Sequence, residues 1–139
     1  MKSIIAEHSR GVLHGRLLLP WGGALLAVSL VLALGDPAAP RAVDADTAAL
    51  LKGFAGLKTV LTLGALTLVS WRLLRPVDRR YLLGYALGVA AMAGATAMVW
   101  QLSHLGVASL FFHGGLFTLL FMGWRDVDPL SGLGRNRRP

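Results

Sequence analysis

Four long apolar blocks dominate this sequence. They cover residues 17–35, 48–74, 81–101 and 105–124 of the 139-residue chain, and even the shortest block has 19 residues. A helix needs about 20 residues to cross the hydrocarbon core of a bilayer, where the backbone must satisfy its own hydrogen bonds. The pattern therefore predicts an all-α integral membrane protein with four transmembrane helices, arranged as an up-down antiparallel bundle.

The composition excludes several classes of protein. Only 15% of the residues are charged and 55% are hydrophobic, whereas roughly a quarter are charged in an average soluble domain. The absence of cysteine excludes disulfides, thiolate metal sites and cysteine nucleophiles. The net charge of +7 would point to nucleic acid in a soluble protein. Here 11 of the 14 lysines and arginines lie outside the apolar blocks, so we expect the lipid bilayer and no nucleic acid as the partner.

The basic residues also predict the orientation of the chain. Of 14 lysines and arginines, three lie before residue 17, four lie between residues 72 and 80, and four lie after residue 124. The positive-inside rule then places both termini in the cytoplasm. Residues 1–16 become a cytoplasmic segment, either a tail or a short interfacial helix, and residues 125–139 become a basic cytoplasmic tail.

Two further features refine this picture. Arginine outnumbers lysine by eleven to three, a bias typical of GC-rich bacterial genomes, so we expect the bacterial inner (cytoplasmic) membrane. The small residues that precede Asp36 resemble a signal-peptide cleavage site, but the 19-residue block before them is longer than the usual apolar region of a signal. We therefore interpret the first block as a retained span.

Small residues in the third block form a ridge suited to helix packing. The spacing of i, i+4, i+7 and i+11 places four of them on one helical face: Gly84, Gly88, Ala91 and Ala95. Small side chains let helix backbones approach closely in lipid. The ridge therefore predicts a contact with another helix, either of the same chain or of another subunit.

Aromatic residues mark the ends of the blocks. The four tryptophans, together with Tyr81 and Tyr85, fall near those ends. This pattern predicts an aromatic belt at the two membrane interfaces.

Two ionisable residues lie deep inside the blocks, away from the block ends: Lys58 and His113. Such residues are expensive in a membrane and are candidates for function by default. Both lie at similar depth from the same predicted outer side, since they are about ten and eight residues from the block ends. The sequence therefore predicts a polar ligand or proton site in the outer half of the membrane. Its residues would be Lys58, Thr59, Thr62, Ser109 and His113, with Gln101 and His104 at its mouth.

The chemistry available to this site is limited. A desolvated lysine can lose its proton, and histidine titrates near neutrality, so an anion, a quinone headgroup or a proton path would suit it. No Asp or Glu lies inside a block, which disfavours cation-coupled export. Hydrolase and P-loop motifs are absent, so we expect no catalytic residues. No metal site is expected either, and no cofactor is predicted, with quinone or haem b as the remaining options.

Three functions therefore remain open. The favoured one is a non-catalytic accessory or structural subunit of a membrane protein complex. Such a subunit would contact other membrane subunits, or copies of itself, through glycine-rich helix faces. The alternatives are a transport or channel module that uses Lys58 and His113, and a redox accessory protein that associates with quinone or haem.

Overall fold

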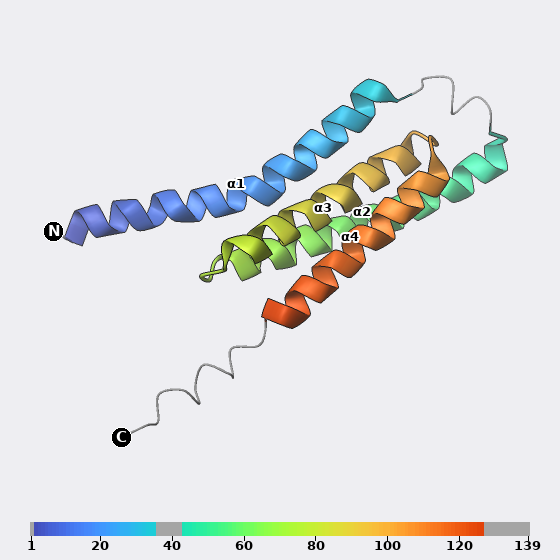
Figure 1. Ribbon diagram of the computed structural model, residues 1–139. Coiled ribbons are helices and arrows are strands. Elements are labelled where there is room, and N and C mark those ends of the chain that lie inside the picture. The colour runs from blue at the N-terminus through green and yellow to red at the C-terminus, as the bar shows by residue number, and fades with distance from the viewer. Residues whose placement is uncertain (1, 36–42, 127–139) are drawn as a thin grey trace.

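Four helices make up the described part of the chain, and no strand occurs there. The computed structural model describes residues 2–35 and 43–126, with backbone alone for residues 2–14. The helices are α1 (Lys2–Leu34), α2 (Ala45–Leu73), α3 (Arg79–Trp100) and α4 (Leu105–Asp126). They alternate in direction along the chain (Figure 1), and each contains a stretch long and apolar enough to cross a membrane. The prediction of four such helices is confirmed, while the orientation of the termini stays a prediction.

The helix ends differ from the predicted spans for local reasons. Helix α1 continues without a break from Lys2, so residues 2–16 extend the first span as one helix, and this extension runs past the other helices in Figure 1. Helix α2 begins three residues before the predicted block because Asp44 Oδ1 accepts a hydrogen bond of 2.9 Å from the Thr47 amide, which caps the helix. Helix α4 continues to Asp126. The remainder of the predicted tail, residues 127–139, lies outside the described residues.

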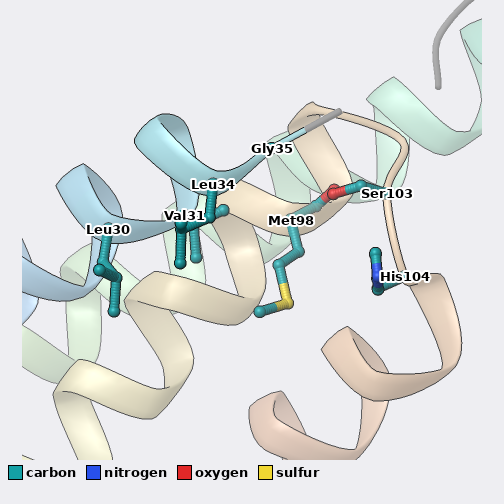
Figure 2. A pocket seen from close by; sticks show the side chains of 7 residues that line it. All are labelled: Leu30, Val31, Leu34, Gly35, Met98, Ser103 and His104. Atoms are coloured by element: carbon teal, nitrogen blue, oxygen red, sulfur yellow. The ribbon is translucent and has the colours of Figure 1, made fainter. Parts of the chain in front are cut away.

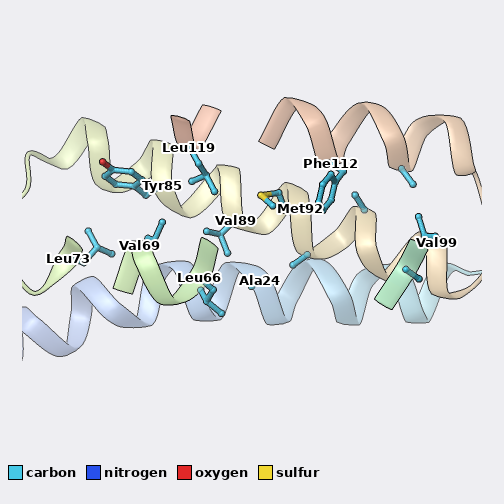
Figure 3. Packing of buried hydrophobic residues seen from close by; sticks show 14 residues of the cluster. Ala24, Leu66, Val69, Leu73, Tyr85, Val89, Met92, Val99, Phe112 and Leu119 are labelled. Atoms are coloured by element: carbon cyan, nitrogen blue, oxygen red, sulfur yellow. The ribbon is translucent and has the colours of Figure 1, made fainter. Parts of the chain in front are cut away.

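Helix α3 is the central element of the fold. It packs against α1, α2 and α4, and 67% of its most apolar stretch is buried, compared with 11–22% for the other three helices. Its many alanines and glycines explain this position, because small side chains on all sides let three neighbours approach. Figure 3 shows Val89 and Met92 of α3, both fully buried, among core residues of the flanking helices.

The predicted small-residue ridge on α3 faces α4. A Cβ added at Gly88 would lie 2.8 Å from Leu119 Cδ2, and one added at Gly84 would lie 2.8 Å from Met122 Sδ. On the opposite side of the contact, a Cβ at Gly115 would lie 2.6 Å from the carbonyl oxygen of Gly88. The two backbones therefore touch through glycine, and this part of the ridge is used within the chain. Ala91 contributes to the same contact, and Ala95 is buried.

A different face of α3 holds α1. A Cβ at Gly94 would lie 3.5 Å from Ala27 Cβ, and a Cβ at Gly23 would lie 3.7 Å from Ala90 Cβ. These are ordinary van der Waals distances, so this contact is looser than the one between α3 and α4.

Candidate functional site

Lys58 lies on α2 and points toward α4. Its Nζ is 4.8 Å from the centroid of the Phe112 ring, and Phe112 is buried. A cation over an aromatic face is attracted by the ring quadrupole, more strongly where water is excluded. Among the described residues no carboxylate pairs with Lys58. The amine is therefore held by an aromatic ring rather than by a counter-ion of the described chain.

His113 contacts the same ring from α4. Its ring meets Phe112 edge-on, with centroids 5.8 Å apart, and the side chain is exposed. Nδ1 lies 2.8 Å from the Ser109 carbonyl oxygen and 3.4 Å from Ser109 Oγ. Lys58 and His113 thus share Phe112 as a neighbour, and no hydrogen bond joins them in the described structure.

Thr59 and Thr62 face another part of the fold. Thr62 Oγ1 lies 3.1 Å from Thr96 Oγ1 of α3, and Trp100 Nε1 donates to Thr59 Oγ1 at 2.9 Å. Both threonines line a cavity of about 290 Å³ between α1, α2 and α3. The polar groups in it mainly tie α2 to α3.

The two residues predicted at the mouth of the site lie at the turn between α3 and α4. Ser103 and His104 line a cavity of about 210 Å³ against the end of α1, as Figure 2 shows. Gln101 is partly buried, and its Oε1 has no hydrogen-bond partner among the described residues. Leu102 and His104 adopt positive φ angles of 54° and 49°, a left-handed conformation that is uncommon outside glycine.

The predicted site residues therefore fall in three places. Lys58 and His113 contact Phe112, with Ser109 beside His113. The two threonines line the cavity beside α1, and Gln101 and His104 belong to the turn. Their use as one ligand or proton site stays a prediction. In the described ranges, no group of three or more His, Cys, Asp or Glu residues could hold a metal ion.

A polar cluster that the sequence analysis missed joins three helices. Arg72 Nε of α2 pairs with Asp126 Oδ2 of α4 at 2.8 Å, and the Tyr85 hydroxyl of α3 donates to the same oxygen at 3.0 Å. Tyr85, which is predicted to lie in the aromatic belt, is only 4% exposed, and its hydroxyl serves this cluster. The sequence contained one signal for this cluster: Arg72 and Asp126 lie at span ends on the same predicted side of the membrane.

Together these features define a protein of four apolar helices, each long enough to span a membrane. Two curated relatives are similar to it: "Uncharacterized protein Rv0083" of Mycobacterium tuberculosis H37Rv and "Uncharacterized protein MT0090" of strain CDC 1551. Each is 34% identical over 115 residues, which is 83% of this chain and 16% of the relative. The chain thus spans about one sixth of the length of these relatives. No family model and no solved structure matches it.

Proposed function

We propose that this chain is a non-catalytic helical unit of a bacterial cytoplasmic membrane that packs against further transmembrane protein. The comparison with the relatives carries the proposal. In these relatives, the similar segment makes up only 16% of a much longer polypeptide. The corresponding helical unit of the relatives is therefore joined to further protein in the same chain. A unit of this kind acts by packing against the other transmembrane parts of an assembly.

The outward face of α2 offers a surface for such a contact. A Cβ added at Gly53, Gly56 or Gly64 would meet no atom within 4 Å, and Val60 between them is 67% exposed. We call Gly53, Gly56, Val60 and Gly64 the α2 outer stripe, because their spacing places them on one helical face. A stripe of small residues lets a second helix approach closely in lipid.

The stripe also differs from the glycines that the fold already uses. Gly84, Gly88 and Gly115 lie against neighbouring atoms, whereas the stripe glycines face open space. The buried side of α2, which includes Ala55 and Leu66, turns toward the core instead. The stripe is therefore available to a partner helix.

Cysteine cross-linking tests the proposal, since the chain has no cysteine. A Gly64→Cys variant, expressed in its host and oxidised or treated with a short bifunctional reagent, should cross-link to one defined transmembrane segment. A matched Gly22→Cys variant on α1, where added atoms also meet open space, should not cross-link to that segment. Equal cross-linking from both positions, or none from Gly64, would contradict the proposal.

One observation favours a transport module as the second candidate. Lys58 lies 13 residues after the start of α2 at Ala45, about 20 Å along the helix at 1.5 Å per residue. Intramembrane lysines commonly mark ion or substrate pathways. Under this alternative, Lys58→Met no longer restores the function that a host strain loses when it lacks the protein, while the cross-link at Gly64→Cys persists. Under the packing proposal, Lys58→Met keeps both the function and the cross-link.

A further inference from the structure

A crevice lies between α2 and α4, next to the cluster of Arg72, Tyr85 and Asp126. Its volume is about 280 Å³, and its walls are mainly apolar side chains of the two helices. Leu68 and Leu120 on these walls are 66% and 61% exposed, so the walls extend to the lipid-facing surface. Arg72 lines the crevice near the end of both helices. The crevice therefore combines apolar walls with a cationic end.

Arg72 retains unused hydrogen-bonding capacity. Its Nε is engaged by Asp126, but Nη1 is buried and has no hydrogen-bond partner among the described residues. A guanidinium carries five N–H donors in a planar fork and binds phosphate oxygens well. The side chain lines the crevice and is 26% exposed, so it can keep its ion pair and still donate to an acceptor in the crevice.

A second arginine lies close to this end of the crevice. Arg75 lies over the Trp71 ring at 5.6 Å, and Trp71 lines the crevice. Arg72 and Arg75 therefore contribute two positive charges from the end of α2, against the single carboxylate of Asp126. The stacking holds Arg75 at the depth of interfacial aromatic residues.

We propose that this crevice binds one anionic phospholipid, with an acyl chain between α2 and α4 and the phosphate at Arg72. Arg75 lies beside the headgroup and supplies further positive charge. Basic pockets between transmembrane helices recognise anionic lipid headgroups in this way. The charge and the apolar walls complement the two parts of such a lipid.

Native mass spectrometry from micelles with equal amounts of phosphatidylglycerol and phosphatidylcholine tests the proposal. We expect the protein to retain one phosphatidylglycerol in preference to phosphatidylcholine. Each arginine near the headgroup should contribute about fivefold to that preference. The variant Arg75→Gln keeps the Arg72–Asp126 pair and should lower the preference by about fivefold.

A second variant fills the crevice without changing any charge. Gly123 lines the crevice, and a Cβ there meets no atom within 4 Å, so Gly123→Leu should fold and lose the retained lipid. Two control variants should retain the lipid. Gly114→Leu lies on the same helix, and a Cβ there also meets no atom within 4 Å. Lys52→Gln removes an exposed charge at the other end of α2.

Two results would overturn the lipid site. One is equal retention of the two lipids by the unaltered protein, and the other is unchanged retention by Gly123→Leu. No residue of the α2 outer stripe lines the crevice, so Gly53→Leu, at the far end of the stripe, should leave the lipid preference intact. The failure of the stripe as a protein contact and the failure of the lipid site are thus measured independently.

Discussion

The glycine contact between α3 and α4 predicts that a single methyl group at Gly115 destabilises the fold. A Cβ at this position would lie 2.6 Å from the Gly88 carbonyl oxygen and 2.9 Å from Met92 Cγ. Ordinary contact begins at 3.4 Å, so the backbones must separate by about 0.8 Å. A radial gap of 0.5–1 Å forfeits a quarter to a half of the dispersion energy of the atoms concerned.

The expected cost follows from that separation. Overpacking of a filled core typically costs about 1–3 kcal/mol, and the backbone carbonyl of Gly88 cannot move aside as a side chain can. The Gly→Ala change also raises helix propensity by up to about 1 kcal/mol in water. The neighbouring Gly114→Ala gains the same propensity, but its Cβ meets no atom within 4 Å. The difference in the free energy of unfolding between the two variants therefore isolates the steric cost.

Reversible unfolding in mixed micelles measures this difference, with far-UV circular dichroism and tryptophan fluorescence as probes. We expect Gly115→Ala to be less stable than Gly114→Ala by about 1–3 kcal/mol. Equal free energies of unfolding would refute the reasoning, because they would show that α3 and α4 do not meet through their backbones at this point.

Other perturbations test separate parts of the structure. Asp126→Asn should lower the free energy of unfolding by about 1–3 kcal/mol in the same titration, since it leaves Arg72 without its ion pair. The Thr47 amide lowers the pKa of Asp44, so the cap stabilises α2 at neutral pH and is lost as the pH falls below about 4; circular dichroism should show this acid-induced loss of helix in the unaltered protein and not in Asp44→Ala. His104→Gly should raise the melting temperature, because glycine adopts the left-handed conformation at φ 49° without a steric cost. An absorbance scan of the purified protein should show no Soret band. If a Soret band is present and His113→Phe abolishes it, the haem alternative is favoured instead.

The helices of this protein are predictable from the sequence because each span depends on local hydropathy. The four blocks agree with α1–α4 to within a few residues at most ends. The central position of α3 was foreshadowed by its small residues, since Gly84 and Gly88 lie in the ridge that meets α4. The continuation of α1 back to Lys2 could not be predicted in the same way, because polar residues such as Lys2 and Arg16 give no apolar signal for a helix.

The site depends on helix rotation, which one sequence does not determine. Lys58 and His113 lie at similar depth, but the residue that faces Lys58 is Phe112, and adjacent helix positions differ by about 100°. The pair of Arg72 and Asp126 was missed for a related reason. Each residue lies at a span end, where charge is expected for topology alone. Their contact depends on how α2 and α4 both pack against α3.

The most direct test of the proposed packing role is native mass spectrometry of the protein purified from its host in gentle detergent. Three forms should be compared: the unaltered chain, Gly64→Leu in the α2 outer stripe, and Gly22→Leu as the control on α1. The account predicts further transmembrane protein with the unaltered chain and with Gly22→Leu, and its loss from Gly64→Leu. Recovery of all three forms without other protein, or with the same partner in equal amount, would contradict it.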